Sequence, residues 1–242
     1  MTRQTPALLF VVLVAAGFSA WFFFKPDPQG NALHSREAAA HALAEYLAQT
    51  QPGKRALIVS NPFTQRKETA KAIREMEQAG IRGLRAGFGD RVTVAAVAFP
   101  ELKPGARENP GALLAEVETT TPLSYLIAPD AFDKLAKQHP DCDLIVSLIG
   151  LPAELGQCES WQAAGAPKFA LLLPDLRIVG DTAAVCSAVK SGKLAALVLA
   201  RPRETDGSLV PGSEFKAGSE QWFVLVTRES VDQVVWSYPG IF

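Results

Sequence analysis

The chain has 242 residues, of which 48% are hydrophobic and 20% are charged. This is ordinary globular material, and the length suits one domain with a substantial core. The 24 basic and 25 acidic residues nearly cancel, and no block of like charges stands out. Neither nucleic acid nor an anionic membrane surface is therefore predicted as a partner.

An uncharged apolar run opens the chain, from Ala7 to Phe24. At about 1.5 Å per residue, a helix over this run comes close to the roughly 30 Å thickness of bilayer hydrocarbon. A cleavable signal peptide is the alternative, because small residues stand at positions 17, 19 and 20. Phe18 interrupts that cleavage pattern, and the apolar run continues beyond it. We therefore expect residues 1–25 to be an uncleaved transmembrane helix that acts as a signal-anchor.

The charges beside this run predict its orientation. Arg3 and the terminal amine precede it, and Lys25 follows it. The balance favours a cytoplasmic N-terminus and a chain that continues on the extracytoplasmic, periplasmic side. We expect residues 26–34 to be a linker and residues 35–242 to form a single extracytoplasmic domain. The membrane is then one partner, bound through the N-terminal helix.

Six short runs that are apolar nearly throughout follow along the chain. Strands that are hydrophobic on both faces belong to parallel sheets covered by helices on both sides. The runs therefore predict a mostly parallel sheet in a three-layer, doubly wound α/β domain. The predicted strands are 56–59, 92–99, 144–149, 169–173, 194–199 and 222–226.

Helical segments alternate with these strands. Ser35 can cap a first helix, which Pro52 and Gly53 end. Two further segments, 101–121 and 203–218, are too long for simple loops and are expected to be excursions. The other predicted helices are 64–79, 122–138 with an interruption at Pro129, 152–164 and 181–191.

Five of the predicted strands end in proline. Proline cannot donate to a strand ladder and suits the first turn of a following helix, so it marks the carboxyl end of a strand. In an open parallel sheet a ligand binds outside these ends. We call this edge the rim. The residues predicted to bind a ligand there are Ser60, Asn61, Phe63, Phe99, Glu101, Glu154, Asp175 and Arg201.

Several rim residues have a structural alternative. Ser60 and Asn61 precede a helix, so helix capping alone can explain them. Glu154 and Asp175 stand where helices start, and helix starts favour acidic side chains. Both interpretations stay open for these four residues.

Motifs that carry catalysis or metal binding are absent from the sequence. It contains no GxSxG, HExxH, Walker or GxGxxG pattern. His139–Asp143 gathers metal-binding residue types, but consecutive residues entering a strand alternate in direction and cannot close a metal shell alone. Gly80–Asp90 follows a helix, so a helix C-cap at Gly80 and a loose turn are expected instead of a phosphate cradle. No catalytic residue, metal or cofactor is predicted.

The three cysteines, Cys142, Cys158 and Cys186, form no CxxC motif. They are either buried small apolar side chains or include a disulfide between Cys158 and Cys186 on neighbouring helices.

In chain order, several segments resemble the first lobe of the type I periplasmic-binding-protein family, which includes sugar-binding receptors. The segments are Ala56–Phe63, Asp141–Pro152, Ala163–Leu173, Ala188–Val198 and Phe223–Asp232. The resemblance spans about residues 54–232 and implies a strand order like 2-1-3-4-5. It also implies a rim that includes Asn61, Phe63, Glu101, Glu154 and Asp175. The family binds its ligand between two lobes, and the length here leaves room for one.

Two functions follow as expectations. The first is a membrane-anchored, solute-binding-like module that recognises a small polar ligand at the rim, where Phe63 and Phe99 can stack on a sugar ring. The alternative is a non-catalytic accessory or assembly subunit of a membrane complex. An enzyme ranks third, because it would need two of Glu101, Glu154 and Asp175 within reach of one substrate.

Overall fold

The computed structural model describes residues 28–113, 122–201, 223–238 and 240–242. The expected anchor, residues 1–25, lies outside these ranges, and so does the expected excursion over residues 203–218. Within the described ranges, no helix is both long and apolar enough to cross a membrane.

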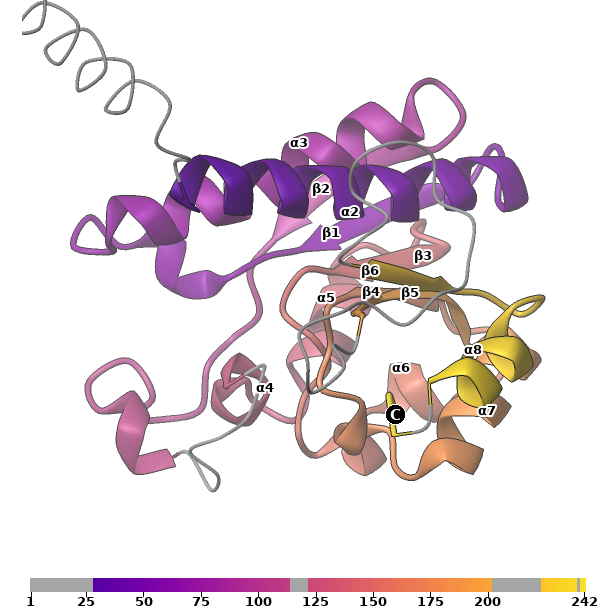
Figure 1. The fold of residues 1–242 in the computed structure, drawn as a ribbon. Helices are drawn as coiled ribbons and strands as arrows, with labels where there is room; N and C mark the ends of the chain where they lie inside the picture. Colours follow the sequence, from indigo (N-terminus) through magenta and orange to yellow (C-terminus); the bar gives the residue numbers. More distant parts are fainter. Residues whose placement is uncertain (1–27, 114–121, 202–222, 239) are drawn as a thin grey trace, which may run out of the picture.

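A six-stranded sheet forms the centre of the fold, in the order β2-β1-β3-β4-β5-β6 (Figure 1). Neighbouring strands from β2 to β5 are parallel, whereas β6 pairs antiparallel with β5 at one edge. The predicted strands and their 2-1-3-4-5 order are confirmed, and the antiparallel edge strand extends that order. The strands are β1 (Arg55–Val59), β2 (Thr93–Ala98), β3 (Leu144–Ser147), β4 (Lys168–Leu172), β5 (Leu194–Ala200) and β6 (Phe223–Val226).

Helices cover both faces of this sheet, in three layers (Figure 1). The helices α2 and α3 lie on one face, and α6, α7 and α8 lie on the other. The central strands are apolar throughout because they are covered on both sides: Ala56–Val59 is fully buried. The α-helices are α2 (Pro28–Thr50), α3 (Lys71–Phe88), α4 (Leu123–Leu126), α5 (Ala131–Gln138), α6 (Glu159–Gln162), α7 (Thr182–Ser191) and α8 (Val231–Ser237). The 3-10 helices are η1 (Pro62–Gln65), η2 (Pro110–Leu113), η3 (Leu155–Gln157) and η4 (Leu176–Ile178).

The long helix α2 completes one face of the sheet. A right-handed connection between β1 and β2 places α3 on this face, and the connections that run from β2 through β5 cross on the other face. Helix α2 fills the remaining area by packing against α3, β4, β5 and β6. It begins at Pro28, so most of the stretch expected to be a linker, residues 26–34, is helical. Its fully buried side chains are Ala39, Ala40, Leu43, Ala44 and Leu47.

Glycines allow α2 and α3 to approach closely. A Cβ atom on Gly83 would lie 2.2 Å from the carbonyl oxygen of Glu37, and one on Gly87 would lie 2.3 Å from that of His41. Only a residue without a side chain fits at such distances. The expected C-cap at Gly80 is wrong, because α3 continues to Phe88 and uses these glycines for helix packing.

Two predicted helices are shorter or later than expected. The segment predicted as a helix over 152–164 contains only η3 and the four-residue α6, because Gly156 weakens helix formation there. The segment predicted as a helix over 64–79 is η1 followed by α3, which begins at Lys71. Helix α8 was not predicted.

Candidate functional site

The carboxyl ends of the parallel strands meet at the rim, where sequence analysis placed the site. The turn after β1 begins it: Pro62 opens η1, and Asn61 caps η1 by accepting a 2.9 Å hydrogen bond from the Phe63 amide through Oδ1. The predicted role of this proline as the first turn of a helix is therefore confirmed. The Asn61 side chain therefore acts as a helix cap, which is the structural alternative considered for it.

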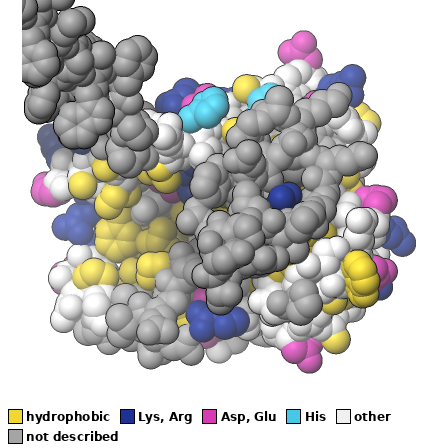
Figure 2. Space-filling model, viewed as in Figure 1, with side chains coloured by type: hydrophobic (Ala, Val, Ile, Leu, Met, Phe, Trp, Pro, Cys, Tyr) yellow, Lys and Arg dark blue, Asp and Glu magenta, His cyan; other side chains and the backbone are white. Residues whose placement is uncertain are grey.

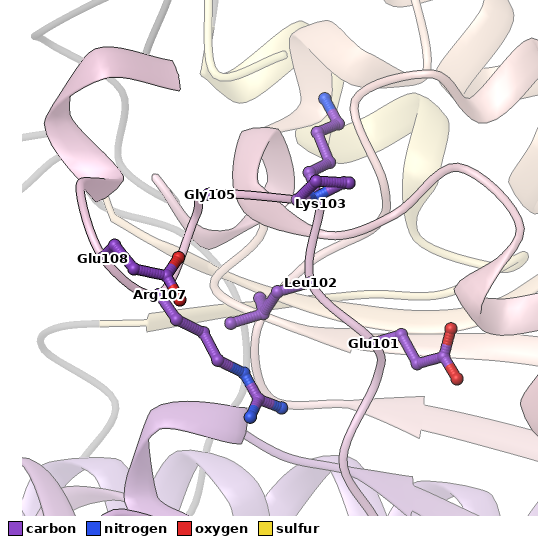
Figure 3. Close-up of a pocket in the computed structure, with 7 residues that line it drawn as sticks. Glu101, Leu102, Lys103, Gly105, Arg107 and Glu108 are labelled. Carbon is purple, nitrogen blue, oxygen red and sulfur yellow. The ribbon is translucent and has the colours of Figure 1, made fainter.

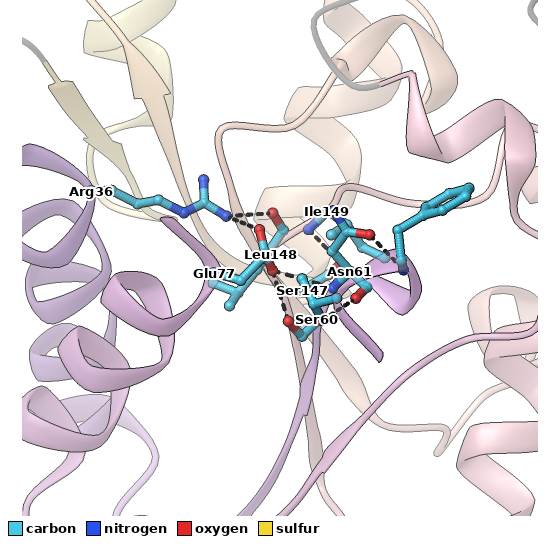
Figure 4. A network of polar contacts seen from close by, with 9 residues as sticks. Arg36, Ser60, Asn61, Glu77, Ser147, Leu148 and Ile149 are labelled. Atoms are coloured by element: carbon cyan, nitrogen blue, oxygen red, sulfur yellow. Dashed lines mark hydrogen bonds and ion pairs between the residues drawn. The ribbon is translucent and has the colours of Figure 1, made fainter. Parts of the chain in front are cut away.

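A buried polar network lies directly behind this turn (Figure 4). The Ser60 hydroxyl donates to Glu77 Oε2 at 2.7 Å, and the Asn61 amide donates to the same oxygen at 3.2 Å. The Arg36 guanidinium donates to Glu77 Oε1 at 2.7 Å and to the carbonyl of Leu148 at 3.2 Å. The network thus joins α2, α3 and the segments that follow β1 and β3.

This network is buried and therefore fixes the geometry of the rim. The Arg36 and Glu77 side chains are only 12% and 10% exposed. Each of the two carboxylate oxygens of Glu77 accepts at least one hydrogen bond, which is what a buried charge requires. Removing one partner from a buried ion pair costs about 3–5 kcal/mol. Ser60, itself fully buried, is held here as part of the scaffold.

The turn after β3 is also fixed internally. The Ser147 hydroxyl donates to the carbonyl of Gly150 at 2.6 Å and accepts from the Ile149 amide at 3.3 Å. Gly150 has φ of 81°, a conformation that favours glycine. This turn leads the chain through Pro152 to Glu154 on the rim.

An open hollow of about 370 Å³ lies in the segment that follows β2 (Figure 3). Its charged side chains have both signs, and Figure 3 shows Lys103 and Arg107 leaving the segment in opposite directions. A hollow of this kind can offer donors and acceptors together to a polar molecule. It is lined by Glu101, Leu102, Lys103, Pro104, Gly105, Arg107 and Glu108.

Ion pairs tie two of these residues to other segments. Lys103 Nζ lies 2.6 Å from Glu154 Oε1 and so joins the segment after β2 to the segment after β3. Glu101 Oε2 lies 2.6 Å from Lys134 Nζ of α5. Hydrogen bonds to Glu101 and to Asp130 raise the pKa of Lys134. The predicted residues Glu101 and Glu154 therefore belong to one part of the rim, each held by a lysine.

The second carboxylate oxygen of Glu154 is buried and has no hydrogen-bond partner among the described residues. A buried acceptor without a donor costs about 1–3 kcal/mol, and more when it is charged. Nearly all buried polar groups in native proteins have partners, so an exception calls for a physical explanation.

The two predicted aromatic residues, Phe63 and Phe99, are half-buried at the ends of neighbouring strands. Figure 2 shows hydrophobic side chains gathered on one side of the molecule, below α2. Phe63 and Phe99 therefore give the rim two aromatic side chains that are only partly buried.

The remaining predicted residues lie farther along the sheet. Asp175 follows β4, and its side chain is 4% exposed and paired with Arg177 at 2.7 Å. Asp175 Oδ1 also caps η4 by accepting from the Arg177 amide at 3.2 Å. Leu173, just before it, has φ of 51°, a strained conformation for a leucine. Arg201 is half-buried after β5.

Sequence analysis missed Arg36, Glu77, Lys103 and Arg107. A signal for the first two existed: Arg36 lies three and four residues before the buried Ala39 and Ala40, and Glu77 lies seven before Leu84. A charged residue on the apolar stripe of a helix points to a buried partner. Lys103 and Arg107 stand in an irregular segment, where no periodicity marks them.

A larger hollow, of about 460 Å³, lies at the opposite edge, near the amino ends of the strands. Its lysines already have partners: Lys54 lies 2.9 Å from Asp143, and Lys168 lies 3.3 Å from Gln51. Burial raises the pKa of Cys142, which also lines this hollow. We therefore favour the rim despite the larger volume here.

All three cysteines are free thiols, so the disulfide considered between Cys158 and Cys186 is not formed. The Cys158 thiol instead donates to Asp133 Oδ1 at 3.3 Å. Asp133 also accepts from the amides of Glu159 and Ser160, at 2.9 and 2.7 Å, and so caps α6. Among the described residues, no group of three or more His, Cys, Asp or Glu side chains could hold a metal ion.

Comparison with known proteins gives matches among solved structures only. No protein-family model and no curated protein matches the chain. A carbohydrate transporter from Acidothermus cellulolyticus 11B in complex with myo-inositol matches with a TM-score of 0.45 and 16% identity, over 86% of this chain and 62% of that one. A substrate-binding protein of a sugar ABC transport system from Bordetella parapertussis 12822 gives 0.45 and 14%, over 85% and 61%.

A sugar-binding protein of an ABC transporter from Bacillus halodurans matches with a TM-score of 0.43 and 12% identity, over 82% of this chain and 64% of that one. The chain thus spans less than two thirds of the length of each of these structures. Each of these three structures is described as part of a carbohydrate or sugar transporter.

Proposed function

We propose that this chain is a membrane-anchored, extracytoplasmic solute-binding-like module that recognises a small polar ligand at the rim. The observation that carries the proposal is the open hollow of about 370 Å³ after β2, which charged side chains of both signs line. A concave site with a few polar groups that converge on it is the usual arrangement for a small solute.

The predicted rim residues have different roles in the proposed site. Phe63 and Phe99 supply apolar faces, and Glu101 and Glu154 supply acceptors. Arg107 supplies a donor, because its guanidinium has no hydrogen-bond partner among the described residues. The predicted ligand contacts of Asp175 and Arg201 stay part of the proposal at the far end of the rim. Ser60 and Asn61 act from behind, by fixing the turn after β1.

A thermal-shift screen of the full chain in mild detergent tests the proposal. The probes are D-glucose, L-alanine and adenosine, each titrated to saturation. A ligand that binds only the folded state raises the melting temperature in a saturable manner. We expect such a rise with at least one probe, and a smaller rise in the Arg107→Ala variant. Lys137→Ala is the control, because Lys137 lies on α5 and is 73% exposed. The absence of any saturable shift would count against a solute site.

The anchor is a separate part of the proposal, supported by the uncharged run from Ala7 to Phe24. Alkaline extraction of membranes that contain the full chain tests it. An anchored chain stays in the membrane pellet, whereas release into the supernatant contradicts the anchor.

The second candidate is a non-catalytic accessory subunit of a membrane complex. Two observations favour it: the polar groups behind the turn after β1 are already bonded to one another, and Trp236 on α8 is 83% exposed. Exposed tryptophans are enriched where proteins bind one another. Purification from its native membrane in mild detergent should then give a defined complex that Trp236→Ala disrupts. Recovery of free monomer alone would exclude this function.

A further inference from the structure

We propose that the rim side of the domain rests on the membrane surface, where Ile73 and Leu113 enter the headgroup layer and three cations bind lipid phosphates. The cations are Arg66, Lys67 and Lys71, and we call the five residues the contact surface. The partner is the bilayer that holds the proposed anchor. The inference therefore rests on that part of the proposed function and adds an interaction surface to it.

Helix α2 starts on the rim side of the sheet. Arg36, in its third turn, donates to the carbonyl of Leu148 just after β3, at 3.2 Å (Figure 4). Gln51, just after the end of α2, accepts from Lys168, the first residue of β4, at 3.3 Å. The helix therefore runs from the carboxyl ends of the strands to their amino ends, and its first residue, Pro28, lies beyond the rim.

The proposed anchor ends close to this helix. The helical residues 28–35 precede Arg36 and span about 12 Å. The two residues before Pro28 add at most about 7 Å. An anchor that ends at residue 25 therefore holds the rim within about 20 Å of the membrane. The amino ends of the strands lie farther away along α2.

Two further segments lie on the rim side. Glu77 accepts from Ser60 directly after β1, so the first turn of α3, Lys71–Arg74, lies about 4–9 Å farther out along that helix. The segment that leads to η2 follows β2 and thus leaves the sheet at the rim. In Figure 1 the start of α2, the segment before α3 and η2 all lie on the left of the molecule.

Exposed hydrophobic side chains gather on this side. Among the residues that the structure describes, three large hydrophobic side chains are exposed: Ile73 (44%), Leu113 (36%) and Trp236 (83%). Ile73 lies in the first turn of α3 and Leu113 ends η2, so two of the three are on the rim side. Apolar side chains beside cations are typical of a surface that contacts the headgroup layer.

The residues around Ile73 are cationic. Segment 66–75 contains four cationic and two acidic residues, whereas the whole chain has a formal net charge of −1. The Lys71 side chain is 83% exposed and that of Arg66 47%. The acidic residues form only exposed pairs, 4.0 and 3.2 Å from the nearest cations, and such pairs are weak. The charge balance of the whole chain did not predict an anionic membrane surface as a partner, because it averages over this segment.

Hydrogen exchange of the full chain in lipid nanodiscs tests the inference. The discs contain phosphatidylcholine and phosphatidylglycerol in equal parts, and the reference is the full chain in mild detergent. We expect slower exchange of backbone amides in residues 64–76 and 108–113 in the discs. Residues 140–143 and 165–168, at the amino ends of the strands, should exchange at the same rate in both.

A pair of double variants tests the cations. Lys67→Glu, Lys71→Glu should lose the protection, because the introduced carboxylates repel anionic headgroups. The matched control, Lys137→Glu, Lys190→Glu, makes the same change near the ends of α5 and α7 that lead toward the amino ends of strands. This control should keep the protection.

A pair of single variants tests the apolar side chains. Ile73→Ser should reduce the protection, because a polar side chain gains nothing by leaving water. Trp236→Ser changes an exposed hydrophobic side chain on α8 and should leave the protection unchanged.

The outcomes separate the inference from the proposed anchor. A chain that stays in the discs without protection on the rim side, or with protection at the amino ends instead, overturns the inference and leaves the anchor in place. Equal protection in the Lys67→Glu, Lys71→Glu variant and in its control also overturns the inference. A chain that separates from the discs on size exclusion overturns the anchor and the inference with it.

Discussion

Arg36 Nη2 lies 2.7 Å from Glu77 Oε1 and 3.2 Å from the carbonyl oxygen of Leu148. The arginine belongs to α2, the glutamate to α3, and the carbonyl to the turn after β3. One guanidinium therefore fixes α2 to the strand ends. Glu77 in turn accepts hydrogen bonds from the Ser60 hydroxyl and the Asn61 amide, so the turn after β1 is held by the same network.

Arg36→Met should destabilise the protein by about 3–5 kcal/mol, because it leaves the Glu77 carboxylate buried without its cation. Denaturant unfolding followed by tryptophan fluorescence measures this. The double variant Arg36→Met, Glu77→Met should lose less than the sum of the single variants, because the uncompensated charge is removed with its partner. Additive losses of less than about 1 kcal/mol each would show that the pair contributes as weakly as a surface pair.

Gly83→Ala should destabilise the protein, although alanine in an open helix interior is favoured over glycine by about 1 kcal/mol. The added Cβ would lie 2.2 Å from the Glu37 carbonyl oxygen and 2.9 Å from the Ala40 Cβ, so α2 must move away from α3. We expect a loss of about 1–3 kcal/mol in the free energy of unfolding. Gly156→Ala is the control, since nothing lies within 4 Å of its Cβ position. A Gly83→Ala variant as stable as the control would contradict the close helix contact.

Asp133 should give the protein an acid-sensitive component of stability. Burial alone would raise its pKa, but the hydrogen bonds from Ser160, the Glu159 amide and Cys158 outweigh burial and hold the pKa below its ordinary value of 3.8. A depressed folded-state pKa adds stability that is present above the unfolded value and is lost as the pH falls through the folded value. Asp133→Asn should therefore cost about 1–3 kcal/mol at neutral pH.

The pH profile is the specific readout for Asp133. Between pH 7 and the ordinary pKa of 3.8 the difference in unfolding free energy between natural chain and variant should stay constant, and it should shrink below that value. A difference that does not change on acidification would show that the carboxylate charge plays no part in capping α6.

The sheet could be predicted from the sequence because each strand is covered on both faces and therefore reads as a continuous apolar run. The prolines that mark the strand ends also predicted the rim, as Pro62 shows. Gly83 and Gly87 were predicted to lie in a loose turn, whereas they lie in α3 and allow it to approach α2. That helix ends more than thirty residues earlier in the chain. Sequence periodicity gives a helix its apolar face but does not say which other helix approaches that face.

The positions of the predicted residues at the strand ends follow from the sequence, whereas their hydrogen-bond and ion-pair partners do not. Glu101 and Glu154 lie in one part of the rim, but the lysines that hold them come from an irregular segment and from α5. Ser60 was predicted as a ligand contact, whereas its hydroxyl is bonded to Glu77. That bond joins residues that are far apart in the sequence, and the packing of α3 against η1 brings them together.

Hydrogen exchange of the full chain in mild detergent, with and without the probe that gives the largest thermal shift, tests the central claim most directly. A ligand at the rim should slow exchange of backbone amides in residues 99–108 and 148–154, which surround Lys103 and Glu154. Exchange near the opposite hollow, in residues 140–143 and 165–168, should not change. Protection of that opposite hollow, or no protection at the rim, would contradict a ligand site at the carboxyl ends of the strands.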